Sequence, residues 1–257
     1  MTATPSTALS PDKRSVIPDS IFNSLSPWLM LISRSILFLF FQGVITAILS
    51  LTCHVLPWEE STRWWLFSVI PANLVSILLL IWLLRAEGQR YWDLLRFSRA
   101  TVRKDLLWLV GSSIIGVPLM MAPMNSLATL IFRNSMAPID MMFRPLPTWA
   151  LVVGFLFPLT IAFAELPTYF GYVMPRLALQ LKNGWIAWLI AAIFLAAQHC
   201  FLPLIPDGRF ILWRLGMYLP FALFIGLLLK LRPSLLPYAV IIHALIDIST
   251  LSVYWMV

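Results

Sequence analysis

Continuous apolar runs of helix length fill most of this 257-residue chain and restrict what it can fold into. In a bilayer, every backbone N–H and C=O must be paired inside the protein, so spanning segments are helices or closed barrels. Barrel strands alternate polar and apolar residues over about ten positions, whereas these runs are apolar throughout. Only 11% of the residues are charged, against about 25% in soluble domains. The sequence therefore predicts an all-α, polytopic transmembrane helix bundle.

We expect about seven spans in a single transmembrane domain at 28–257, preceded by a flexible cytoplasmic tail at 1–27. The tail is rich in Ser, Thr and Pro, and the apolar run after it is too long for a signal-peptide core. The predicted spans are residues 28–56, 64–84, 105–132, 149–182, 185–204, 210–229 and 234–257. Pro158 and Pro167 are expected to bend the fourth span.

Basic residues are unequally distributed between alternate loops. With a cytoplasmic N-terminus, thirteen Lys and Arg, Arg34 among them, fall on inner segments and five, including Arg214, on outer ones. Cytoplasmic loops retain such residues, so the net charge of +7 indicates membrane orientation rather than binding to nucleic acid. Aromatic residues interleave with the basic ones at 85–104, which predicts an interfacial segment lying on anionic lipid headgroups.

Four ionisable residues lie where lipid would reject a charge. Glu165 interrupts the apolar fourth span, His199 lies in the fifth, and His243 and Asp247 lie in the seventh. Ionisable groups inside spans are costly and usually face a partner or a cavity. His243 and Asp247 are four residues apart, so their side chains share one helix face. A cluster of this kind is more typical of a functional site than of packing alone.

Two chemistries fit these four residues. Glu165 can act as a general base on water while the histidines stabilise an oxyanion. Alternatively, Glu165, His199 and His243 can hold a divalent metal such as zinc and leave one position open for water. Thr168, Tyr169 and Tyr172 give the face of Glu165 further hydrogen-bonding capacity.

The remaining titratable candidates carry less information. His54, near the outer end of the first span, is interpreted as interfacial rather than catalytic. Cys53 and Cys200 lie in apolar segments, and two such residues give neither a zinc motif nor a disulfide framework.

The motifs around the four residues resemble those of the CPBP intramembrane proteases, the CAAX-protease and bacteriocin-processing group. That family carries Glu-Glu-x-x-x-Arg running into Gly-Tyr, then Phe-x-x-x-His, then His-x-x-x-Asn or His-x-x-x-Asp. Here AELPTYFGYVMPRL aligns on Gly171-Tyr172 and places Glu165 on the first glutamate. FLAAQH supplies His199, and HALID supplies His243 and Asp247. The resemblance covers residues 149–252.

The chain departs from the family pattern at three positions. The second glutamate is Leu166, the motif arginine is Phe170, and the phenylalanine of the second motif falls on Leu195, with Phe194 one place early. The Glu/Arg pair that supports the family's site is therefore missing.

The resemblance implies an intramembrane endopeptidase in a bacterial-type inner (plasma) membrane, hydrolysing a membrane-associated peptide or protein. Its catalytic residues would be Glu165, His199, His243 and Asp247. Two alternatives remain open at this point: a catalytically silent relative acting as an immunity or regulatory protein, and a small proton-coupled transporter. The absence of a detectable internal repeat weakens the transporter hypothesis.

Overall fold

The computed structural model describes residues 21–52 and 56–255. Most of the predicted tail, together with Cys53 and His54, lies outside the described residues. The first helix, α1, covers Ile21–Thr52, so residues 21–27 are helical and not part of a tail as the sequence had predicted. Within α1 the Ser26 side chain is buried, and its hydroxyl accepts a hydrogen bond from Tyr172.

Seven helical segments of the described chain are long and apolar enough to cross a membrane. They are Ser24–Thr52 in α1, Trp65–Ala86 (α3), Val102–Phe132 (α4), Thr148–Gln180, Gly184–Phe201, Gly208–Leu231 (α10) and Pro233–Tyr254. The described residues contain no β-strand. The protein is therefore a multi-pass, all-α membrane protein, as predicted.

The fourth span is built from four pieces. Helix α6 (Thr148–Gly154) turns at Phe155 into α7 (Leu156–Leu166). A π-helical segment, η2 (Pro167–Val173), then leads into α8 (Met174–Gln180). Pro167 has no backbone N–H to donate, which favours a change of helical register at this point. The predicted disturbance at Pro167 is confirmed, whereas the earlier break falls at Phe155 rather than at Pro158.

Helix α9 (Gly184–Gln198) packs one face against α8 and α10, and its opposite face is exposed. Four alanines of this helix have no exposed surface: Ala187, Ala191, Ala192 and Ala196. Elsewhere in the bundle, α1 packs on α3, while α7 packs on both α3 and α11 (Leu236–Leu251). Small side chains let helix backbones approach closely in lipid.

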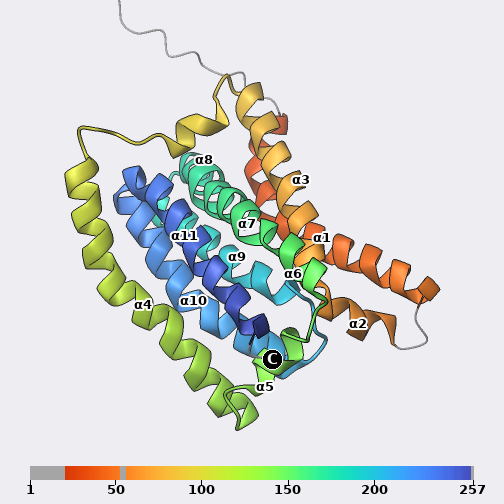
Figure 1. Cartoon of the computed structure of the whole chain (residues 1–257). Coiled ribbons are helices and arrows are strands. Elements are labelled where there is room, and N and C mark those ends of the chain that lie inside the picture. Colours follow the sequence, from red (N-terminus) through yellow and green to blue (C-terminus); the bar gives the residue numbers. More distant parts are fainter. Residues whose placement is uncertain (1–20, 53–55, 256–257) are drawn as a thin grey trace, which may run out of the picture.

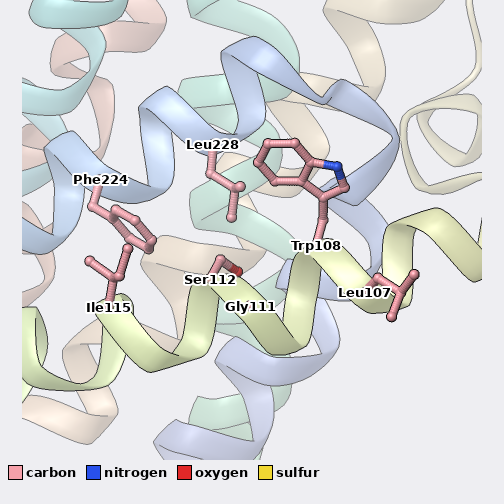
Figure 2. A pocket seen from close by; sticks show the side chains of 7 residues that line it. All are labelled: Leu107, Trp108, Gly111, Ser112, Ile115, Phe224 and Leu228. Atoms are coloured by element: carbon pink, nitrogen blue, oxygen red, sulfur yellow. The ribbon is translucent and has the colours of Figure 1, made fainter.

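Helix α4 runs along one flank of the molecule beside α10 (Figure 1). Most of its apolar side chains are exposed, which suits contact with lipid. An apolar groove of about 350 Å³ separates part of α4 from α10. Figure 2 shows Trp108, Ser112 and Ile115 facing Phe224 and Leu228 across it. The four predicted site residues do not line this groove.

Shorter elements connect the spans. They are α2 (Pro57–Arg63), η1 (Tyr91–Leu95), α5 (Ala137–Met142), η3 (His199–Phe201), η4 (Pro233–Leu235) and η5 (Ser252–Trp255). Asp207 caps α10 by accepting hydrogen bonds from the backbone N–H groups of Arg209 and Phe210. Hydrogen bonds from the Arg209 side chain and backbone lower the pKa of Asp207, so this cap stays ionised at neutral pH.

Candidate functional site

Glu165 lies on the last turn of α7, two residues before the π-helical segment begins at Pro167. Its side chain is almost fully buried, at 4% exposure for the residue. A π-helical turn widens the helix and reorients the side chains around it, and such turns are frequent at functional sites. Helix α7, which is otherwise almost entirely apolar, therefore places one carboxyl group in the interior of the bundle.

His199 follows the last residue of α9 and begins the short segment η3. Its Nδ1 lies 2.9 Å from the carbonyl oxygen of Leu195, which holds the ring. Its Nε2 lies 3.7 Å from Oε2 of Glu165. The ring stacks on Tyr218 of α10, with centroids 3.6 Å apart and planes inclined by 17°.

His243 and Asp247 approach the same carboxylate from α11. The Nε2 atom of His243 lies 3.6 Å from Oε1 of Glu165 and 3.1 Å from Oδ2 of Asp247. Both residues are half-buried, whereas Glu165 and His199 are buried. The four predicted residues therefore lie together on three helices, and the site is most open on the α11 side.

Each carboxylate oxygen of Glu165 faces one histidine at a distance slightly beyond a hydrogen bond. Direct, fully paired packing would shorten these distances to about 2.7–3.2 Å. The buried Nδ1 of His243 has no hydrogen-bond partner among the described residues. From these contacts we expect the four residues to line one cavity, which is distinct from the α4/α10 groove and from the small pocket beside η1.

Sequence reasoning missed the closest partners of Glu165. Gln198 donates from Nε2 to Oε2 of Glu165 at 2.6 Å. Arg34 of α1 donates from Nε to Oε1 of Gln198 at 2.7 Å, and its Nη2 lies 4.0 Å from Oε2 of Glu165. Arg34 and Gln198 have no exposed surface. A buried guanidinium therefore stands opposite the buried carboxylate, with an amide between them.

Other polar groups hold this pair in place. Arg34 also donates from Nη2 to Oδ1 of Asn73 on α3 at 3.0 Å, and Asn73 donates in turn to Thr160. The hydroxyl of Tyr169 lies 3.3 Å from Oε1 of Gln198. Buried polar networks of this type fix side-chain geometry, and Nη1 is the one guanidinium nitrogen of Arg34 without a hydrogen-bond partner among the described residues. Tyr172 instead bonds Ser26 and Glu87, away from Glu165.

The two motif positions that depart from the family are occupied by apolar packing. Leu166 and Phe170 are both buried. The Phe170 ring lies against Gly226 of α10, where an added Cβ would come within 2.7 Å of it. The cation near Glu165 thus comes from α1, and position 170 contributes packing instead.

Arg214 is a second buried arginine beside the site, at 3% exposure. Its guanidinium donates to the backbone carbonyls of His199 and Leu202 and so holds the end of α9. The charge count had placed Arg34 on an inner segment and Arg214 on an outer one. Both residues instead lie inside helices and are buried. Without them, twelve basic residues remain on inner segments against four on outer ones, so the asymmetry persists.

The geometry does not favour a metal centre at this site. Among the residues that the structure describes, no group of three His, Cys, Asp or Glu side chains is placed to hold a metal ion. Oε2 of Glu165 accepts the Gln198 amide and faces Arg34. A nearby guanidinium repels a divalent cation, so this donor set fits a carboxyl group held by hydrogen bonds better than a zinc ligand.

One signal could have identified the missed residues. Arg34, Asn73 and Gln198 are polar residues inside apolar runs, and Gln198 immediately precedes a predicted site histidine. Polar side chains in spans face the bundle rather than lipid, so all three were candidates for the interior.

Comparisons with protein-family models, with curated proteins and with solved structures found no match to this chain. The resemblance to CPBP proteases therefore rests on residue types, spacing and order along the chain.

Proposed function

We propose that the protein is an intramembrane endopeptidase that hydrolyses a peptide bond in a membrane-associated substrate. One observation carries the proposal: His199 and His243 each direct Nε2 at a different oxygen of the buried Glu165. A carboxylate and two imidazoles around one point supply a base and two polar groups for hydrolysis of an amide.

In the proposed reaction, Glu165 removes a proton from water as the water oxygen bonds to the substrate carbonyl carbon. His243, held by Asp247, stabilises the oxyanion of the tetrahedral intermediate. The C–N bond then breaks, and the proton on Glu165 passes to the leaving amine. His199 orients the water or the carboxyl group, because its Nδ1 is already bonded to Leu195.

Arg34 and Gln198 act as positioning residues in this proposal. The Gln198 amide holds one oxygen of Glu165, and Arg34 holds the Gln198 amide oxygen. These two contacts orient the carboxyl group that is to take the proton from water. The α1 arginine thereby offsets the loss of the family's supporting Glu/Arg pair.

The decisive test replaces Glu165 by glutamine, which keeps its size but removes proton acceptance. A screen of prenylated, leader-type and regulatory membrane peptides first finds a substrate, and elemental analysis of the same sample tests for metal. Hydrolysis should then fall at least about a hundredfold, the lower bound for acid–base assistance. Glu59→Gln makes the same chemical change at an exposed position of α2 and should leave the rate unchanged. His199→Ala and His243→Ala should give losses that do not add to that of Glu165→Gln.

A second candidate is a catalytically silent immunity or regulatory protein. The apolar packing of Leu166 and Phe170 at motif positions favours it. In that case Glu165→Gln keeps full biological activity at matched expression, whereas Ala192→Leu, which crowds buried α9, abolishes it. Wild-type function in cells that carry Glu165→Gln would rule out the protease.

We further propose a bacterial-type inner (plasma) membrane location with a cytoplasmic N-terminus, which the basic asymmetry supports. A reporter fused after Lys104 should then read cytoplasmic, and one fused at Val257 external. Reporters on the same side would contradict the seven-span topology.

A further inference from the structure

A small pocket opens where α3 ends and η1 begins, apart from the candidate site. Its lining residues are Ile81, Arg85, Arg90, Tyr91 and Trp92, and its volume is about 290 Å³. We call it the Arg85/Arg90 pocket. Pockets that hold small ligands start at about 300 Å³, so the volume suits one compact polar group. Because Arg85 and Arg90 line the pocket, that polar group is expected to be an anion.

The two guanidinium groups are available to a ligand. No carboxylate of the described residues lies within 4.0 Å of Arg85 or Arg90, although nine other ion pairs occur there. The nearby Glu87 is paired with Arg176, and Asp93 accepts a hydrogen bond from the backbone N–H of Arg90. Neither carboxylate is therefore paired with the guanidinium group of Arg85 or Arg90, and these two groups give the pocket a positive charge. Guanidinium groups match the geometry of phosphate oxygens.

An exposed apolar stripe continues from the pocket along α3. Leu78, Trp82 and Arg85 are spaced at i, i+4 and i+7, so they share one face of the helix. Leu78 is 65% exposed and Trp82 56% exposed. Trp92, at 68% exposure, adds an aromatic residue at the level of the arginines, where tryptophan favours the membrane interface. A charged rim above an apolar stripe matches a phospholipid rather than a free anion.

From this geometry we propose that the Arg85/Arg90 pocket binds the phosphate headgroup of an anionic phospholipid, with an acyl chain lying along Leu78 and Trp82. The neighbouring basic residues of the 85–104 segment raise the local concentration of such lipids, whereas the pocket selects one of them by direct contact.

The pocket is also connected to the helix that carries Glu165. Tyr91, 4% exposed, donates its hydroxyl to the carbonyl oxygen of Phe163 at 2.6 Å. Phe163 lies two residues before Glu165 on α7, and Trp92 packs edge-on against its ring. Burial raises the pKa of the Tyr91 hydroxyl, so it remains a neutral donor. A lipid that orders Tyr91 and Trp92 therefore also steadies the last turns of α7.

The test uses the full-length protein in nanodiscs of phosphatidylcholine with or without phosphatidylglycerol. Phosphatidylglycerol should raise the thermal unfolding midpoint and slow amide exchange across η1 and the end of α7. In Arg85→Gln/Arg90→Gln, lipid affinity should fall about tenfold or more, since each basic residue near the surface contributes about 1 kcal/mol. Tyr91→Phe should still bind the lipid but lose the protection of α7.

The matched control is Arg96→Gln/Arg99→Gln, which removes the same charge from the same segment outside the pocket. It should keep most of the affinity for phosphatidylglycerol. An equal loss in both double variants would overturn the proposal in favour of diffuse attraction to a negative surface. Inorganic phosphate alone is the second control, and an equal rise in the unfolding midpoint would assign the pocket to a soluble anion instead.

Discussion

Helices α1 and α4 are similar as sequences and different as parts of the protein. They contain 32 and 31 residues, and the mean hydropathy of their best windows is 2.0 and 1.8. Yet α1 sends Arg34 and Gln42 into the interior, both without exposed surface. Helix α4 packs mainly along α10 on the flank of the bundle (Figure 1).

Hydropathy therefore identifies a span but not its place in the bundle. In α1, Gln42 bonds both the N–H and the C=O of Leu204, so one side chain ties α1 to the chain after α9. In α4, the buried Asp105 lies near the first turn and accepts hydrogen bonds from Arg232 and Ser234. Most of the surface of both helices is exposed, so the two differ in how they are attached: α1 has buried polar side chains at several levels, whereas α4 has one near its first turn.

The largest effect is expected from removing the α1 arginine. Arg34→Met deletes the cation beside Glu165 and the donors to Gln198 and Asn73. Breaking a buried ion pair on one side typically costs about 3–5 kcal/mol. The free energy of unfolding in detergent should fall by that amount. Arg103→Met removes an exposed arginine from α4 and should change stability by less than about 0.5 kcal/mol. Equal effects of the two variants would erase the distinction between the helices.

A smaller effect should come from one substitution, Gly→Ala, made in a central and in a peripheral helix. At Gly226 of α10, the new Cβ would lie 2.7 Å and 2.9 Å from the Phe170 ring. Overpacking of this kind costs about 1–3 kcal/mol. At Gly111 of α4 nothing lies within 4 Å of the added Cβ, and alanine is favoured over glycine in a helix by up to about 1 kcal/mol.

The unfolding midpoints of the two variants should therefore move in opposite directions. A fall in both would mean that α4 is more tightly packed than its exposed side chains indicate. A rise in both would mean that the Phe170 ring can move away from α10 despite being buried.

The sequence was sufficient to predict the seven spans, because apolar runs and the loops between them are local properties. Glu165, His199, His243 and Asp247 were expected to converge because each is an ionisable residue inside an apolar run, and the motif resemblance supported the same grouping. The π-helical segment after Pro167 was predicted only as a bend, since a proline marks where a register can change but not how. Arg34 was counted among the basic residues of the inner segments. Its pairing with Glu165 could not be predicted, because Glu165 lies 131 residues further along the chain. Pairing between distant helices depends on packing that no single window of sequence contains.

The smallest expected effect concerns the attachment of α4 itself. Oδ1 of Asp105 accepts hydrogen bonds from Nε of Arg232 at 2.6 Å and from the hydroxyl of Ser234 at 2.8 Å. Ser234→Ala removes one of the two, which costs about 0.5–1.5 kcal/mol. Because α4 has few other inward polar contacts, the loss should appear as faster amide exchange at its N-terminal end, with exchange in α7 unchanged. Ser112→Ala is the control, since that hydroxyl bonds only its own helix, at Leu109. If amide exchange became equally faster in α4 and in α7, then loosening α4 would also loosen the helix that carries Glu165. In that case α1 and α4 would differ only in degree in how firmly they are attached.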